Sequence, residues 1–130
     1  MEINKENKTV KMERVFDAPR DLVWRVSTDK NLIPEWWGPS AYTTVVDKMD
    51  FVDNGEWRYV QKGEGSEEYA FHGKFMNIDV PNSFEWTFEF EGMPGQVITE
   101  KYLYEEVDGN KTKVTTISYY DSLESLEGMI

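Results

Sequence analysis

The sequence contains no cysteine and only one histidine among its 130 residues. Without thiols the chain cannot form disulfides, use a thiolate as a nucleophile or hold a metal ion through cysteine. A single histidine also cannot build the common histidine-rich metal sites. We therefore expect no metal ion and no other cofactor.

Basic residues are also scarce, because 14 Lys and Arg stand against 25 Asp and Glu, giving a net charge of -11. This charge repels nucleic-acid phosphates and anionic lipid head groups, which are bound by clustered Lys or Arg. The chain has no run of about 18 apolar residues, and its start, MEINKENKTV, lacks the apolar stretch of a signal peptide. We expect a cytoplasmic protein with no nucleic-acid partner and no membrane insertion.

Common enzyme motifs are missing as well. The sequence has no Gly-x-Ser-x-Gly elbow, no phosphate-binding Gly-x-x-x-x-Gly-Lys and no His-Glu-x-x-His. The stretch 50–55 resembles a calcium loop only superficially, since Val52 stands where such a loop needs an oxygen ligand and Gln61 where it needs a bidentate glutamate. Acid–base chemistry by carboxylates and tyrosines inside a cavity stays open, but no motif indicates it.

Aromatic residues are abundant, with five Trp, seven Tyr and seven Phe. A chain of this length with 39% hydrophobic residues can bury about two thirds of its surface in one core. No linker, repeat or low-complexity tract interrupts it. The sequence therefore predicts a single domain over residues 1–130.

Period-two alternation at Val10, Met12 and Phe16 predicts a half-buried first strand. Arg14 shares the apolar face of that strand. A buried guanidinium needs a carboxylate partner, either a Glu of the sheet or an anionic group of a ligand. Arg14 is thus a candidate site residue with a structural alternative.

Two short helices are expected after the first strand. The first has Asp17 as its cap and Pro19 in its first turn. Its apolar face is formed by Leu22, Val23 and Val26. The second runs from Leu32 and Ile33 to the pair Trp36 and Trp37, where Gly38 and Pro39 end it.

The rest of the chain alternates strands with turn residues at the close spacing of an antiparallel meander. The strands are expected at 42–51, 55–62, 69–78, 83–91, 97–107 and 111–120. In 83–91 four aromatic residues share one face, while acids or Thr share the other. Residues 121–130 have helical spacing for about two turns.

Several motifs together resemble the activator-of-heat-shock-ATPase-like family, which has the START-like, birch-pollen-allergen fold. They are RVFDAP at 14–19, LVW at 22–24, WWGP at 36–39 and GEWRY at 55–59. The resemblance implies an α+β helix-grip fold, in which a curved antiparallel sheet of about seven strands and a C-terminal helix enclose a cavity for a hydrophobic ligand. Family members continue for roughly seven more helical turns, so this C-terminal helix is expected to be truncated, by trimming or natively. A natively short helix would leave apolar surface that favours self-association.

Large rings at alternate strand positions are candidates for the cavity wall, with ordinary core packing as the alternative. They are Trp57, Tyr59, Phe71, Phe75, Trp86, Phe88 and Tyr102. Trp36 and Trp37 are candidates for the rim of the cavity, or for packing against the sheet edge. His72 is a candidate polar contact, although strict alternation turns it away from Phe71 and Phe75.

The sequence thus predicts a small-molecule binding protein whose ligand is hydrophobic and lipid-, polyketide- or flavonoid-like. Two alternatives remain open. One is a co-chaperone-like module that acts on the 90-kDa heat-shock ATPase, for which the family name is the motivation. The other is a cavity enzyme of cyclase or hydrolase type.

Overall fold

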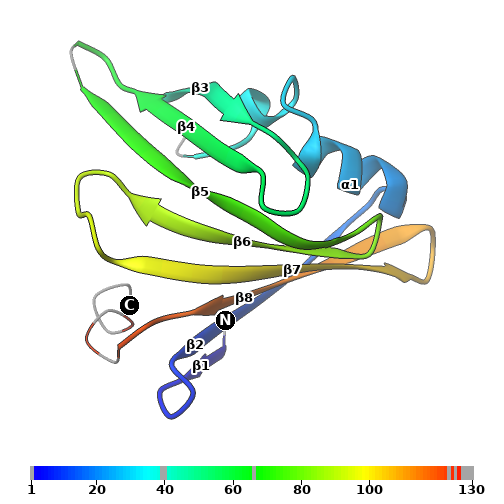
Figure 1. Ribbon diagram of the computed structural model, residues 1–130. Coiled ribbons are helices and arrows are strands. Elements are labelled where there is room, and N and C mark those ends of the chain that lie inside the picture. Colours follow the sequence, from blue (N-terminus) through cyan, green and yellow to red (C-terminus); the bar gives the residue numbers. More distant parts are fainter. Residues whose placement is uncertain (1, 39–40, 66, 123, 125, 127–130) are drawn as a thin grey trace.

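The computed structural model describes residues 2–38, 41–65, 67–122, 124 and 126. Within them, eight strands form one curved antiparallel sheet, accompanied by one α-helix and one short 3-10 helix (Figure 1). In chain order the elements are β1 (Glu2–Asn4), β2 (Thr9–Phe16), α1 (Arg20–Thr28), η1 (Ile33–Glu35), β3 (Thr43–Met49), β4 (Glu56–Lys62), β5 (Glu68–Asp79), β6 (Ser83–Phe90), β7 (Val97–Val107) and β8 (Lys111–Tyr119). The α+β class is confirmed.

The strands lie in the order β1-β2-β8-β7-β6-β5-β4-β3. The six strands from β3 to β8 form the expected meander, and their bounds agree with the predicted ones to within two residues. β2 pairs with β8, so that the start of the chain lies beside its last strand. The sheet has one strand more than expected, because β1 pairs with β2 at the edge. β1 is short and polar, and so carries no hydrophobic alternation that could predict it.

The two faces of the sheet differ in what covers them. We call inner the face on which α1 lies, since the α1 residues Val23 and Trp24 belong to one buried cluster with side chains of β4 to β7. The ring of Trp24 packs edge-on against Tyr104 and Phe84, with centroids 4.9 and 5.8 Å apart. The other face, which we call outer, carries the alternate residues of the same strands.

The start of α1 differs from the prediction. Pro19 is the N-cap residue, and none of the described side chains caps the helix, so the expected role of Asp17 is wrong. The carbonyl of Pro19 instead accepts the backbone N–H groups of Leu22 and Val23, each at 3.1 Å. The helix buries Val23 and Trp24, while Leu22 is exposed. The apolar face is therefore rotated by one position from the expected one.

The second predicted helix is a single 3-10 turn, η1, rather than a helix that reaches the tryptophans. Ile33 is buried in the turn, and the backbone leaves the helical conformation at Trp36, where φ is -139°. The two tryptophans consequently lie in a connecting segment.

β2 is less buried than its alternation predicts. Val10 is buried, but Met12 and Phe16 are 55% and 38% exposed. The main buried cluster involves α1, η1 and β4 to β7. The alternation in this segment correctly predicts a strand, but Met12 and Phe16 are less buried than it predicts.

The predicted helix at 121–130 falls largely outside the described residues. Glu124 and Leu126 are helical, and the N–H of Leu126 donates to the carbonyl of Ser122 at 3.1 Å. Leu126 is fully buried against Val10 and Tyr120. Among the described residues, the helices are too short or too polar to cross a membrane.

Candidate functional site

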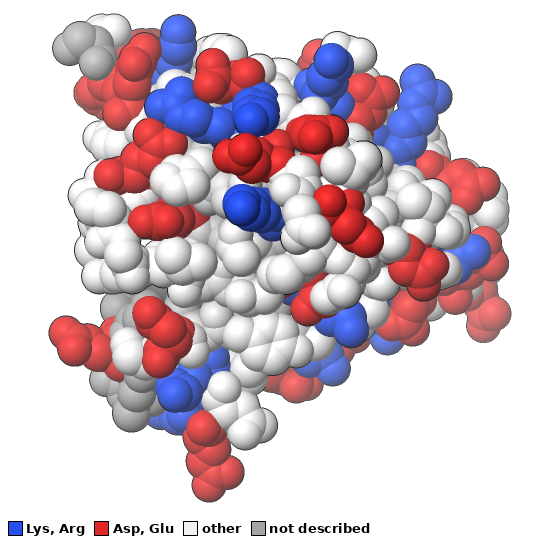
Figure 2. All heavy atoms as spheres, viewed as in Figure 1, with Lys and Arg blue, Asp and Glu red and all other residues white. Residues whose placement is uncertain are grey.

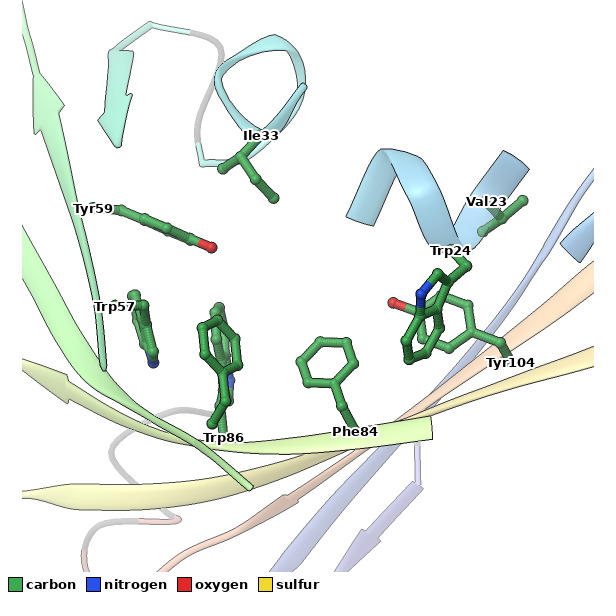
Figure 3. Close-up of a cluster of buried hydrophobic side chains, with 9 residues drawn as sticks. Val23, Trp24, Ile33, Trp57, Tyr59, Phe84, Trp86 and Tyr104 are labelled. Carbon is green, nitrogen blue, oxygen red and sulfur yellow. The ribbon is translucent and has the colours of Figure 1, made fainter. Parts of the chain in front are cut away.

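The inner face of the sheet holds a continuous layer of aromatic rings (Figure 3). Trp57 stacks on Trp86 with ring centroids 4.1 Å apart and an interplanar angle of 16°. Tyr59 tilts against Trp57 at 4.7 Å, and Phe75 lies 6.1 Å from Trp86. These four side chains are almost fully buried. The layer arises because inward positions on adjacent antiparallel strands face the same space.

Partly buried rings surround this layer. Trp37 meets Tyr59 and Phe71 edge-on, with centroids 5.1 and 5.5 Å apart. Tyr102 meets the edge of Trp86 at 5.7 Å, and Phe88 lies 5.3 Å from Phe71. The buried layer is therefore flanked by rings that are only partly buried.

A glycine makes room for the central indole. Gly73 lies opposite Trp57 in the register of β4 and β5. A Cβ at Gly73 would overlap the carbonyl oxygen of Thr87 and lie 2.7 Å from Trp57 Nε1. That carbonyl accepts the Trp57 indole N–H at 3.1 Å. The missing side chain at Gly73 therefore permits both the packing and the hydrogen bond of Trp57.

One charged side chain, Glu100 on β7, also points to the inner face. Its Oε1 accepts the indole N–H of Trp86 at 2.8 Å and the hydroxyl of Tyr102 at 3.1 Å. Its Oε2 accepts the hydroxyl of Ser118 at 2.7 Å. The three donors come from β6, β7 and β8, so the sheet fixes the carboxylate from both sides.

The phenols of the inner face have raised pKa values. Burial raises the pKa of Tyr104 to about 12 and raises that of Tyr59. The pKa of Tyr102 lies well above its ordinary value because of burial and because the Glu100 carboxylate disfavours a nearby phenolate. These hydroxyl groups consequently remain protonated donors around neutral pH.

A second polar group lies beside Trp37. The Gln61 side chain is buried, and its amide nitrogen donates to Thr44 Oγ1 and, at 3.4 Å, to the carbonyl of Trp37. Its Oε1 finds no donor in the part of the chain that the structure describes. Gly38, with φ of +84°, packs directly on this amide. The polar cluster fixes the segment that carries Trp37.

The structure brings eight of the eleven candidate residues together on or beside the inner face. They are Trp37, Trp57, Tyr59, Phe71, Phe75, Trp86, Phe88 and Tyr102. Trp36, by contrast, is 48% exposed and donates its indole N–H to the carbonyl of Val26 at 2.9 Å. Trp36 therefore ties its segment to α1 instead of joining the rings.

Arg14 and His72 also lie apart from the aromatic layer. Arg14 is exposed on β2, and its guanidinium lies 5.4 Å from the centroid of the Phe16 ring. The described residues give it no ion pair with a Glu of the sheet, so that prediction is wrong for them. His72 lies on the outer face, as alternation predicts. Its Nδ1 and Nε2 lie 3.0 and 3.3 Å from carboxylate oxygens of Glu91 and Glu89.

The outer face around His72 is an ionic surface. Arg58 binds Glu91 through two nitrogens at 2.8 and 3.0 Å and reaches Asp47 at 3.2 Å. The hydrogen bond from Arg58, followed by that from His72, lowers the pKa of Glu91 to about 2. An open groove of about 620 Å³ runs along these residues. Figure 2 shows acidic and basic side chains intermixed where β3, β4 and β5 lie in Figure 1.

Sequence reasoning missed Glu100. Alternation within 97–107 places residue 100 on the same face as Tyr102, so the pattern contained the information. The surroundings of Glu100 include donors from two other strands, which no local pattern reveals.

One family model matches most of the chain. The sequence profile of a family described as "Activator of Hsp90 ATPase homolog 1-like protein" matches residues 17–128. No curated protein matches the chain. The crystal structure of protein Ms6760 from Mycobacterium smegmatis has a TM-score of 0.87 and 25% identity, and the match covers 98% of this chain and 82% of that one.

Two further solved structures are similar to this chain to different degrees. A protein from Arthrobacter aurescens has a TM-score of 0.88 and 24% identity, covering 97% of this chain and 76% of that one. A structure described as an Hsp90 activator from Plasmodium falciparum has a TM-score of 0.65 and 15% identity, covering 87% and 73%. At these identities the two structures show a shared fold alone.

Proposed function

The chain belongs to the Activator of Hsp90 ATPase homolog 1-like family, and from that premise we propose that it binds a hydrophobic small molecule on the inner face of its sheet. The observation that carries the proposal is the aromatic layer, whose buried floor is continuous with partly exposed rings. Binding sites for small molecules combine such apolar walls with a few polar groups that fix orientation.

The rings favour a planar or elongated apolar ligand, of lipid-, polyketide- or flavonoid-like shape. Trp37, Phe71, Phe88 and Tyr102 supply flat or edge-on surfaces that a guest can cover. Each 100 Å² of apolar surface that a ligand removes from water contributes about 2.5 kcal/mol before the cost of association. Contact with several of these rings is therefore enough for measurable affinity.

Binding is favoured over acid–base catalysis on this face. A general acid works best when its pKa is near the working pH. The pKa of Tyr102 is well above its ordinary value, so this phenol is a poor proton donor to a substrate. Its hydroxyl is also already donated to Glu100. The pair of Tyr102 and Glu100 is thus better suited to holding a ligand than to moving its protons.

Adjacent tryptophans provide the test. Trp37 packs against the aromatic layer, whereas Trp36 donates its indole N–H to α1 and is half exposed. A library of planar aromatics and fatty acids is titrated while the five indole N–H resonances are followed by NMR. We expect ligands to shift the Trp57 and Trp86 signals. Trp37→Ala should weaken binding by about tenfold, and the control Trp36→Ala should leave it within about twofold.

Unshifted resonances across the whole library would remove the proposal. Equal effects of the two substitutions would place binding elsewhere than at the inner face. Both variants are first checked by circular dichroism, so that lost binding is not mistaken for lost folding.

Action on the 90-kDa heat-shock ATPase is the second candidate function. Family membership is what favours it, since the description of the matching family names that activity. The purified protein would be added to the ATPase over a range of concentrations while phosphate release is measured. A concentration-dependent stimulation that survives Trp37→Ala would favour this function over ligand binding, and an unchanged rate up to excess protein would exclude it.

A further inference from the structure

Glu100 has more acceptor positions than it has donors among the described residues. A carboxylate offers about four lone-pair positions on its two oxygens. Trp86 and Tyr102 donate to Oε1, and Ser118 is the one described residue that donates to Oε2. The side chain is partly exposed. Among the described residues, Oε2 therefore keeps one acceptor position without a donor.

No ion pair recorded for the described residues offsets this charge. The Lys and Arg side chains whose ion pairs the structure describes are paired with other carboxylates, not with Glu100. The histidine lies on the opposite face, between Glu89 and Glu91. The three donors to Glu100 are all neutral at neutral pH. A carboxylate in such surroundings is stabilised when a positive charge comes close.

The surroundings of Glu100 also suit a cation with an apolar body. Trp86 and Tyr102, which fix the carboxylate, meet edge to face at 5.7 Å. Aromatic faces attract cations, and Trp and Tyr do so most strongly. On its other side, Ile98 and Tyr120 belong to the smaller buried cluster of the sheet. A negative charge therefore lies between two apolar surfaces.

We propose that Glu100 makes the inner face select hydrophobic ligands that carry a protonated amine. The inference rests on the proposed binding function and specifies the chemical class of its ligand. The ammonium group donates to Oε2 of Glu100 while the apolar body covers Trp86 and Tyr102. An anionic ligand of the same shape is repelled by the same carboxylate.

Matched probes test this selectivity. The probes are 1-naphthylmethylamine, 1-naphthylmethanol and 1-naphthoate, which share one ring system and differ in the charge of the substituent. Their dissociation constants are measured by calorimetry at neutral pH for the wild-type protein, Glu100→Gln and Glu105→Gln. Glu105 lies on the same strand and is exposed, so its substitution makes the same change of charge away from the site. The Trp86 indole N–H resonance reports whether a probe reaches Glu100.

We expect the wild-type protein and Glu105→Gln to bind the amine at least about tenfold more tightly than the alcohol, which corresponds to one charge-assisted hydrogen bond. Naphthoate should bind most weakly. In Glu100→Gln the preference should fall to within about twofold, with the alcohol still bound.

Three results would overturn the inference. Equal affinity of the wild-type protein for amine and alcohol, or a preference that persists in Glu100→Gln, refutes the role of Glu100 while ligand binding stands. Absence of binding by all three probes and by the ligand library refutes the binding function itself and the inference with it. Thermal unfolding of each variant shows that the comparison is made between folded proteins.

Discussion

The inner and outer faces of the same strands are chemically opposite. On β4, Trp57 and Tyr59 enter the aromatic layer, while Arg58 between them binds Glu91 and Asp47. On β5, Phe71 packs against Trp37, while His72 contacts two glutamates. Both faces belong to the same strands and share their backbone hydrogen bonds. The two faces therefore differ in side-chain hydration: inward side chains stabilise the fold by leaving water, and outward charged groups keep most of their hydration.

Loss of a central ring should have the largest effect. Trp57 is 1% exposed, stacks on Trp86 and donates to Thr87. Trp57→Ala leaves a cavity and an unpaired carbonyl, and we expect it to lower the free energy of unfolding by about 3–5 kcal/mol. Urea denaturation followed by circular dichroism measures the change. A loss below about 1 kcal/mol would show that the aromatic layer does not act as a packed core.

Adding one methyl group to the inner face should have the next largest effect. In Gly73→Ala the new Cβ meets backbone atoms of Thr87 and the Trp57 indole, which cannot all move aside. We expect a loss of about 1–3 kcal/mol, together with a shifted Trp57 indole N–H resonance. Lys74→Ala, at the neighbouring position on the other face, is the control and should change little. Equal stability of the two variants would contradict the close approach at Gly73.

The outer face should respond to pH. The pKa of Glu91 is lowered from 4.5 to about 2, chiefly by Arg58. A carboxyl group with a lowered pKa in the folded state stabilises the protein above its ordinary pKa, and this contribution disappears as pH falls from about 4.5 towards 2. Since the Glu91 side chain is 32% exposed, we discount the effect for screening to about 1 kcal/mol.

Glu91→Gln should accordingly be less stable than the wild-type protein by about 1 kcal/mol at pH 7, and the two should converge near pH 2. Urea midpoints at several pH values measure this, with Glu105→Gln as the charge-matched control. A constant difference across the pH range would mean that Glu91 acts through packing and not through its charge.

An exposed ion pair should have the smallest effect. Lys48 and Glu56 lie 3.3 Å apart with side chains 55% and 59% exposed. We expect Lys48→Ala to lower the free energy of unfolding by less than about 0.5 kcal/mol at low salt. At high salt this difference should disappear, because salt screens exposed charges. Thermal unfolding at low and high salt checks this. A loss of stability as large as that caused by Gly73→Ala would contradict the proposed difference between the two faces.

The predictable part of the site followed from alternation. Period-two spacing correctly placed Trp57, Tyr59 and Trp86 inside and His72 outside. Local sequence could not separate Trp36 from Trp37, because a turn whose conformation is set by packing directs one indole to α1 and the other to the sheet. Local sequence also gave the wrong cap for α1. The N-cap residue is Pro19, and Asp17 lies two positions before it.

The sequence by itself determined the strands, the meander and the two contrasting faces, because alternation and turn residues act over a few neighbouring positions. Only the tertiary structure decided which inward residues meet. Trp86, Tyr102 and Ser118 are far apart in the chain and converge on Glu100 through the register of β6, β7 and β8. The register between two strands depends on the hydrophobic pattern along their whole length. The position of a carboxylate among aromatic rings is therefore fixed only when the sheet has assembled.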